Sequence, residues 1–323
     1  MAEATLRHRD DEAVEFTAVA AIVEGQVIQL KDGRAAISHA AVNAAGTGLA
    51  TVNGTWTLEK TASIAILEGG RVYWDVSANK AHFKHVNDKD FYIGTAAADA
   101  AEADSTVKVV LNARQNLLTD LVDGAFESVL VGTPALGTAT APGMGFPKPR
   151  GGGVVFQLDA TNEAQKVDLL SVNGFAAGAK AIVEGAFRVI NDGAGTNTDV
   201  SLGVASATHA SDAGAIAESV FIHLNGNAAD IFAESDDGTV EVAETDTTKN
   251  YTEGAALANR VEFWLDMRTP ADVQIYIDGV LILGSTVFNV NVAAGPWFLL
   301  AHVEKALSTD VYAIALDWLC ARL

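Results

Sequence analysis

The sequence has few cysteines and prolines and no long apolar run. Its 323 residues include one cysteine, Cys320, which excludes an intramolecular disulfide. Gly, Asn, Asp or Lys interrupts every apolar stretch before it reaches the roughly 18 residues that a membrane helix needs. The first twelve residues contain no apolar core of a signal peptide. We therefore expect a globular protein that is made in the cytoplasm and has no membrane partner.

Basic residues are also scarce. The chain has 21 Lys and Arg against 41 Asp and Glu, a net charge of −20. Such a charge disfavours a phosphate-binding surface, so we expect no nucleic-acid partner. Residues 1–113 carry 10 basic and 15 acidic residues, whereas residues 114–323 carry 11 and 26. The second part therefore holds most of the negative charge.

Catalytic motifs are missing as well. There is no phosphate loop, no His-Glu-x-x-His and no Gly-x-Ser-x-Gly. We expect no enzyme and no cofactor. One alternative is a polysaccharide hydrolase or lyase that uses two carboxylates of an acidic cluster as acid and base. Carboxylates this dense more often mark an exposed loop or strand face; the cluster comprises Glu234, Asp236, Asp237, Glu241, Glu244 and Asp246.

Two segments contain side chains of the types that bind metal ions. His82 and His85 are three residues apart, so on a strand their imidazoles would point to opposite faces. The segment 191–199 has oxygen-bearing side chains at turn positions but lacks the ligand spacing and closing glutamate of a calcium-binding EF-hand loop. We expect no metal at either segment.

The dominant pattern is alternation of apolar and polar residues in short runs bounded by Gly, Asn and Asp, which is typical of strands and turns. The sequence Asp278-Gly279 between two such runs predicts a tight hairpin, and Asp32-Gly33 predicts another. Short strands up to about residue 111 suggest a small β-barrel or β-sandwich. Longer strands from residue 154 onward suggest a larger two-sheet sandwich. The fold class expected is all-β.

Four of the six prolines lie in residues 132–153, together with a run of three glycines. We therefore divide the chain into an N-terminal domain, 1–113, a Pro/Gly-rich connector, 114–153, and a C-terminal domain, 154–323. Within the connector, residues 114–123 are expected to form a short helix or an ordered link.

A series of segments in residues 1–113 carries the clearest signal of relationship. They are, in chain order, Ala4–Asp11, Val14–Ala18, Val23–Val27, Leu58–Ala62, Leu67–Asp75, Tyr92–Ala96 and Val107–Asn112. The most specific piece is Gly69-Gly70-Arg71-Val72-Tyr73-Trp74-Asp75. In these segments the N-terminal domain resembles the capsid decoration (cement) proteins of tailed phages.

Three segments of the C-terminal domain carry a second resemblance: Val261–Asp266, Asp272–Val280 and Pro296–Phe298. In these segments the domain is similar to a concanavalin-like jelly roll, the lectin-like sandwich attached to some phage head proteins. A shared fold does not by itself imply sugar binding.

These resemblances imply a virion protein on the outer surface of an icosahedral phage head. It would bind the major capsid protein and clamp neighbouring subunits, as a homotrimer at threefold or quasi-threefold positions, with the acidic jelly roll facing outward. Arg7, His8 and Arg9 of the N-terminal arm would contact the capsid or neighbouring copies, as would Tyr73 and Trp74. An ordinary frayed terminus is the alternative for the arm.

The alternative for the jelly roll is that it binds host-surface glycans. Trp297 is then the candidate aromatic contact, because Trp264 and Trp318 lie inside apolar runs and are expected in the core.

Overall fold

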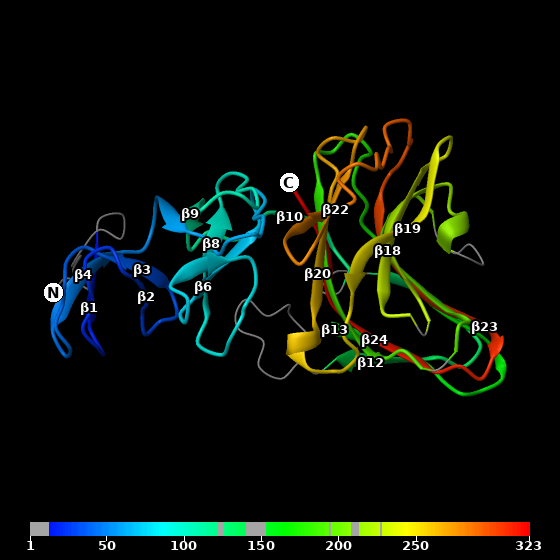
Figure 1. Ribbon diagram of the computed structural model, residues 1–323, viewed down its shortest axis with the longest axis horizontal. Helices are drawn as coiled ribbons and strands as arrows, with labels where there is room; N and C mark the ends of the chain where they lie inside the picture. Colours follow the sequence, from blue (N-terminus) through cyan, green and yellow to red (C-terminus); the bar gives the residue numbers. More distant parts are fainter. Residues whose placement is uncertain (1–12, 122–125, 140–152, 194, 208–212, 227) are drawn as a thin grey trace, which may run out of the picture. The chain divides into compact units, whose positions relative to one another are not determined.

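The computed structural model describes residues 13–121, 126–139, 153–193, 195–207, 213–226 and 228–323. It divides into two compact units, 1–115 with 143–147 and 116–142 with 148–323. The described residues are strands, turns and two 3-10 segments, η1 (Ala213–Ala215) and η2 (Leu257–Asn259), so the prediction of an all-β chain is confirmed (Figure 1). No described helix is long and apolar enough to cross a membrane.

The N-terminal unit contains two antiparallel sheets. One has the strand order β1-β4-β3-β2, and the other has the order β5-β9-β8-β6-β7. Their bounds are β1 (Val14–Thr17), β2 (Val27–Gln29), β3 (Ala35–Ser38), β4 (Thr47–Thr51), β5 (Thr55–Glu59), β6 (Arg71–Asp75), β7 (Lys80–His82), β8 (Phe91–Ala96) and β9 (Thr106–Leu111). The predicted Asp32-Gly33 turn joins β2 to β3, with Gly33 at a φ of 89°.

The two sheets are copies of one motif. Their strand orders match when β1, β2, β3 and β4 are equated with β5, β6, β8 and β9, and β7 is an addition to the second copy. In the first copy, an isolated antiparallel bridge between Ile22 and Val42 joins the β1–β2 loop to the β3–β4 loop. In the second copy, the bridge between Ile66 and Ala100 joins the β5–β6 loop to the β8–β9 loop. Gly25 N donates to Ser38 O as Gly69 N donates to Ala96 O, each at 2.8 Å. No repeated motif in the sequence predicted this duplication.

Asn112, directly after β9, joins the two motifs. Its Oδ1 accepts from Ala35 N at 2.9 Å, and its Nδ2 donates to Ala35 O at 2.9 Å and to Val52 O at 2.6 Å. Asn112 has a φ of 57°, a conformation that asparagine tolerates better than most residues. One amide therefore satisfies three backbone groups, two at the start of β3 and one directly after β4.

We expect Asn112→Ala to destabilise the N-terminal unit by about 2–3 kcal/mol, because it leaves these backbone groups without their partner. Hydrogen exchange across residues 13–115 of the full chain would measure the loss. Asn43→Ala, at an exposed loop position, is the matched control and should change stability by less than about 0.5 kcal/mol. Equal protection in both variants would contradict this role for Asn112.

The C-terminal unit is a sandwich of two antiparallel sheets. One sheet has seven strands in the order β11-β14-β23-β16-β17-β18-β19, and the other has eight, in the order β12-β13-β24-β15-β20-β21-β22, with β10 also paired to β24. The bounds are β10 (Leu117–Asp120), β11 (Phe126–Val131), β12 (Ala135–Ala139), β13 (Gly153–Leu158), β14 (Glu163–Ser171), β15 (Ile182–Asn191), β16 (Thr198–Ala205), β17 (Glu218–Asn225), β18 (Asp230–Asp237), β19 (Glu241–Asn250), β20 (Val261–Asp266), β21 (Gln274–Ile277), β22 (Val280–Ile282), β23 (Phe298–Ser308) and β24 (Tyr312–Arg322).

Residues 117–121 and 126–139 belong to this sandwich. The stretch expected to connect the domains supplies β10 and β12 to the eight-stranded sheet and β11 to the seven-stranded sheet. The segment 114–123, expected as a short helix or an ordered link, contains β10, which continues the sheet beside the last part of β24. Residues 122–125 and 140–152 lie outside the described residues.

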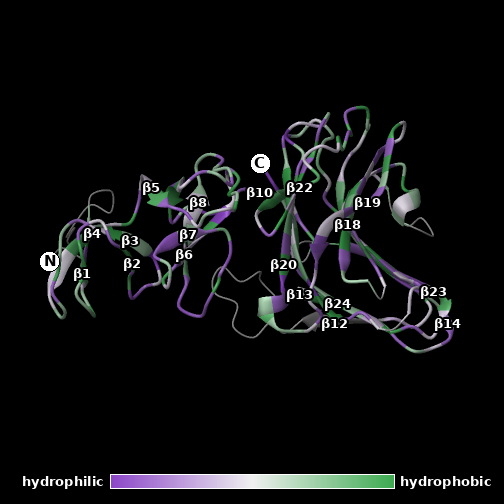
Figure 2. Cartoon of the chain, in the orientation of Figure 1, coloured by the Kyte–Doolittle hydropathy of each residue, from purple (hydrophilic) through white to green (hydrophobic). Residues whose placement is uncertain are grey.

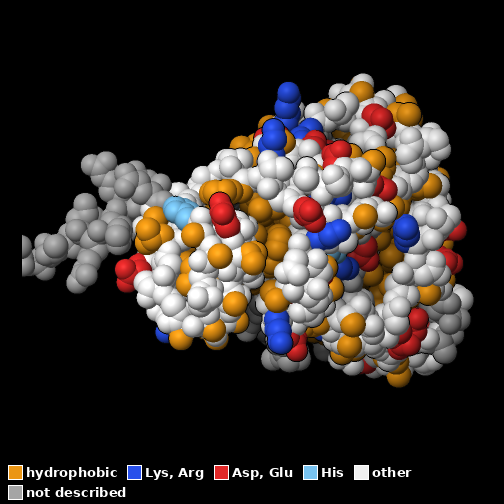
Figure 3. Space-filling view, turned by 60° about the vertical axis from the view of Figure 1, so that its left-hand side comes forward, with side chains coloured by type: hydrophobic (Ala, Val, Ile, Leu, Met, Phe, Trp, Pro, Cys, Tyr) orange, Lys and Arg blue, Asp and Glu red, His pale blue; other side chains and the backbone are white. Residues whose placement is uncertain are grey.

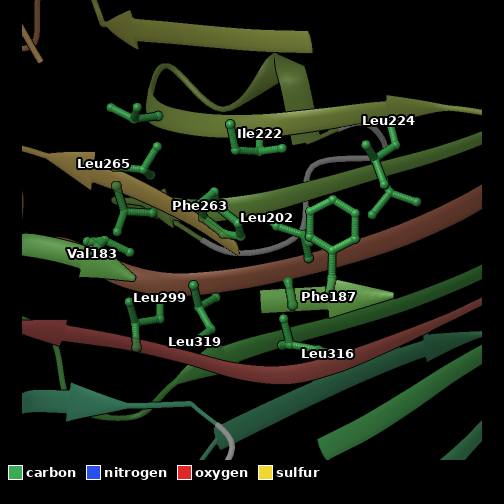
Figure 4. Packing of buried hydrophobic residues seen from close by; sticks show 14 of the residues in the cluster. Val183, Phe187, Leu202, Ile222, Leu224, Phe263, Leu265, Leu299, Leu316 and Leu319 are labelled. Carbon is green, nitrogen blue, oxygen red and sulfur yellow. The ribbon is translucent and has the colours of Figure 1, made fainter. Parts of the chain in front are cut away.

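The core of the sandwich lies between the two sheets, where alternate side chains of both meet. Hydropathy alternates along the strands as this packing requires (Figure 2). Figure 4 shows aliphatic and aromatic side chains of both sheets in contact, among them Val183, Phe187, Leu202, Ile222, Leu224, Phe263, Leu265, Leu299, Leu316 and Leu319. At the predicted hairpin, Asp278 and Gly279 have φ values of 48° and 77° and join β21 to β22.

Candidate functional site

The two loops of the first motif form an exposed apolar surface, here called the first loop pair. It comprises residues 18–25 and 39–46, which are joined by paired hydrogen bonds of 2.8 and 2.9 Å between Ile22 and Val42. Val19 is 90% exposed and Val23 is 65% exposed. Exposed apolar side chains grouped on one short loop are typical of a surface that contacts another molecule.

The second motif shows the same loop buried. Val23-Glu24-Gly25 corresponds to Leu67-Glu68-Gly69, because Gly25 and Gly69 both have positive φ values, 74° and 73°, and make equivalent hydrogen bonds. Leu67 is only 4% exposed. Likewise Ala21 is exposed, whereas its counterpart Ala65 is buried. The motif can thus bury this loop, and its first copy leaves it open.

The first loop pair carries almost no charge. Glu24 is its one acidic residue and it has no Lys or Arg. Its one histidine, His39, bonds through Nε2 to Thr51 Oγ1 at 2.5 Å. Acidic side chains occur at intervals over much of the visible face of the molecule (Figure 3). An uncharged patch on a chain of net charge −20 is therefore a distinct feature.

The contact residues predicted from the resemblance are not part of the first loop pair. Arg7, His8 and Arg9 lie outside the described residues. Tyr73 and Trp74 are buried on β6. The Tyr73 ring packs edge-on against Tyr92 at a centroid distance of 5.7 Å and against His85 at 6.1 Å. Both aromatic side chains thus help to build the unit, and their role as contact residues stays a prediction.

The candidate glycan contact, Trp297, is fully buried. It lies in the core of the sandwich and pairs through its backbone with Phe175 at 2.8 Å. A sugar needs an exposed aromatic face, so Trp297 cannot serve as that contact as the chain stands. Trp264 and Trp318 are also buried, as expected, but they lie outside the cluster between the sheets, and Trp318 stacks against the guanidinium of Arg260 at 4.9 Å.

A row of polar side chains crosses the outer face of the seven-stranded sheet. Strand register places Asp168, His302, Ser201 and His223 side by side on β14, β23, β16 and β17. Ser201 Oγ lies 3.2 Å from His223 Nδ1, and His302 Nδ1 lies 3.5 Å from Asp168 Oδ2. We call these four residues the histidine row.

Carboxylates surround both imidazoles of the histidine row. His223 Nε2 lies 3.2 Å from Asp199 Oδ1 and 3.7 Å from Glu244 Oε1, and His223 Nδ1 lies 3.7 Å from Glu234 Oε1. His302 Nε2 lies 3.4 Å from Glu304 Oε2. Both imidazoles are almost completely buried.

Burial by itself would lower the pKa of both histidines, because it penalises the charged imidazolium. At His223 this effect is outweighed by hydrogen bonding to Glu234 and by the charges of Asp199, Glu234 and Glu244, which raise its pKa to about 9. At His302, Asp168 and Glu304 do the same and raise its pKa to about 9. Both side chains are therefore cations at neutral pH.

The histidine row was not predicted from the sequence. His223 and His302 each occupy a polar position in an apolar strand, which is the only local signal. Their proximity depends on the pairing of both strands with β16, which no local pattern specifies.

The acidic cluster considered for catalysis is divided between β18 and β19. Glu234 and Glu244 face His223, whereas Glu241 pairs across the strands with Asp236. Within the described ranges, no three His, Cys, Asp or Glu side chains are arranged to hold a metal ion.

Comparison with known families matches residues 8–111 to the family described as "Phage cement protein". This agrees with the resemblance drawn from the N-terminal sequence. A comparison with curated proteins gives no match.

Several solved structures match part of this chain at low similarity. The carbohydrate recognition domain of Emp47p has a TM-score of 0.38 and 10% identity, over 64% of this chain and 93% of that one. The carbohydrate esterase vb_24B_21 of the Shiga toxin-encoding bacteriophage phi24B has a TM-score of 0.40 and 12% identity, over 64% and 98%. LamAcat of Zobellia galactanivorans has a TM-score of 0.38 and 12% identity, over 54% and 78%. Similarity this low assigns no ligand or activity to this chain.

Proposed function

We propose that this chain is a structural protein of a phage virion that binds the outside of an icosahedral head and clamps neighbouring major capsid subunits. The match of residues 8–111 to the phage cement proteins carries the proposal. The first loop pair supplies the docking surface, because its side chains are apolar and nearly uncharged and can be buried without leaving a charge unpaired.

Clamping requires contacts with more than one capsid subunit. We propose that three copies associate at a threefold or quasi-threefold position and that each presents its first loop pair to a different subunit. Several modest contacts then act together, because the second and third contacts form at high effective concentration. The proposed orientation has the C-terminal unit facing the solvent, where the net charge of −15 on residues 114–323 keeps neighbouring copies and other virions apart.

The docking surface is tested by placing a charge within it. We expect the double variant Val19→Glu, Val23→Glu to reduce binding to heads stripped of their decoration at least tenfold, since burying an unpaired carboxylate costs well over the 1.4 kcal/mol that a factor of ten represents. Co-sedimentation with the heads measures bound copies per capsid subunit.

Val240→Glu is the matched control, because Val240 is another exposed valine but lies in the C-terminal unit. It should bind as the unmodified chain does. Equal binding by all three proteins would contradict docking through the first loop pair. An unmodified chain that binds host glycans and not heads would instead support the glycan-binding alternative.

A further inference from the structure

The seven-stranded sheet ends in two very different edge strands. At one edge, β19 has irregular pairing with β18 at two places and carries Glu241, Glu244, Asp246 and Lys249. Charges and irregularities of this kind prevent a sheet from adding another strand. At the other edge, β11 pairs with β14 over six consecutive residues without a shift, and its sequence, Phe-Glu-Ser-Val-Leu-Val, has a single charge. The β11 edge lacks the protection that the β19 edge has.

The side chains of β11 that face the core side are left partly uncovered. Ser128 is paired with Leu169 and Leu130 with Val167, and both partners belong to the core. Because alternate residues of a strand share a face, Phe126, Ser128 and Leu130 point to the core side of the sheet. Core-facing aliphatic and aromatic residues on β16 and β17 are fully buried, yet Phe126 is 37% exposed and Leu130 is 49% exposed. The rim of the core is therefore open along β11.

Among the described residues, β14 is the only strand that pairs with β11. The opposite backbone edge of β11 can therefore accept a further strand by the hydrogen bonding that sheets use to bind extended segments. The strand that fits is one that also brings apolar side chains to the open rim.

The sequence of β11 is complementary to itself in the antiparallel direction. Opposite residues in an antiparallel pair point to the same face, so a twofold pairing must centre on one residue. Centred on Ser128, it sets Phe126 of each copy opposite Leu130 of the other. It sets Glu127 opposite Val129, so the two carboxylates do not face each other. Two apolar cross-strand pairs then cover both open rims.

We propose that two copies of this chain associate through antiparallel pairing of their β11 strands, centred on Ser128, so that their seven-stranded sheets become continuous. This twofold contact does not depend on head binding and is separate from the threefold association proposed above. Where trimers form, it would join chains of neighbouring trimers.

Single-cysteine substitutions along β11 of the full chain test both the contact and its register. Opposite residues of an antiparallel pair have Cα atoms about 4.5–5.5 Å apart, within the range of about 4.4–6.8 Å that a disulfide spans. We expect Ser128→Cys to form a covalent dimer under mild oxidation, seen on a non-reducing gel. Glu127→Cys and Val129→Cys are displaced along the strand from their own copies and should not. The native Cys320 is buried and serves as a constant background.

The mass of the assembly in solution gives the second measurement. We expect Leu130→Lys to halve the number of copies per particle in light scattering coupled to gel filtration, because a lysine would enter the apolar pair. Val240→Lys, at the turn between β18 and β19, should leave the mass unchanged. Since Leu130 is half exposed, the variant should keep the circular dichroism spectrum of the unmodified chain. Equal masses for the three proteins, or cross-linking that does not favour Ser128→Cys, would overturn the proposal.

Discussion

Raising the pH from 6.5 to 9.5 is expected to destabilise the C-terminal unit by several kcal/mol. His223 and His302 both have a pKa of about 9 in the folded chain, against 6.5 for a free imidazole. A pKa raised on folding means that the folded state binds the proton more tightly. The resulting stabilisation is complete below pH 6.5 and is lost as the pH rises through 9. Each imidazole contributes on the order of 3 kcal/mol.

Deprotonation also leaves negative charge without compensation. Asp199, Glu234 and Glu244 face His223, while Asp168 and Glu304 face His302. Lys166, whose Nζ lies 3.6 Å from Glu304 Oε2, still compensates part of this negative charge when His302 is neutral. Urea unfolding of the C-terminal unit at a series of pH values measures the effect. The double variant His223→Gln, His302→Gln should show a much flatter dependence over this range, and a flat dependence in the unmodified chain would contradict the prediction.

Asp317→Asn is expected to cost about 3–5 kcal/mol of stability. Asp317 is fully buried on β24, where its Oδ1 and Oδ2 accept hydrogen bonds from Arg188 Nη2 at 2.6 Å and Nε at 3.1 Å. Removing one partner of a buried ion pair leaves the other charge without compensation. Arg188 also donates to the carbonyl oxygen of Ala255, so the loop before β20 should loosen as well.

An exposed aspartate–arginine pair provides the control for Asp317→Asn. Asp32 and Arg34 have an Oδ2–Nε distance of 2.8 Å, but their side chains are 50% and 39% exposed. Water screens such a pair, so Asp32→Asn should cost less than about 1 kcal/mol. Chemical unfolding of both variants, with hydrogen exchange to assign each transition to its unit, distinguishes the two results. Similar losses in the two variants would show that burial does not set the energy of the pair.

Local sequence signals predicted the features that depend on adjacent residues. Asp278-Gly279 predicted its hairpin because a tight turn between paired strands requires positive φ values, which these residues supply. The alternation of apolar residues predicted an all-β chain, because successive side chains of a strand point to opposite faces of the sheet. Strand β19 was less visible, because its sequence is almost wholly polar and its place in the sheet comes from pairing with β18.

Features that depend on distant residues were missed. The histidine row requires β17 and β23 to flank β16, although His223 and His302 are far apart in the chain. The duplicated motif is obscured by β7, which occurs in one copy only, and by loops that share little more than a Glu-Gly pair. The prolines and glycines of residues 132–153 led to the prediction of a connector from residue 114. Strands β10 and β11 precede that stretch, and each of them pairs with a strand of the C-terminal sandwich.

The position of β24 determines when the sandwich can fold during synthesis. All eleven of its residues are buried, and it lies between β13 and β10 on one side and β15 on the other. The eight-stranded sheet therefore has a gap at its centre until residue 322 leaves the ribosome. The strands of the N-terminal unit are complete by Leu111, and at about 5–20 residues per second this unit can fold some 10–40 s before the sandwich closes. During that interval the unfinished sheet exposes core strands, so the C-terminal unit is the part of the chain that we expect to depend on chaperone protection.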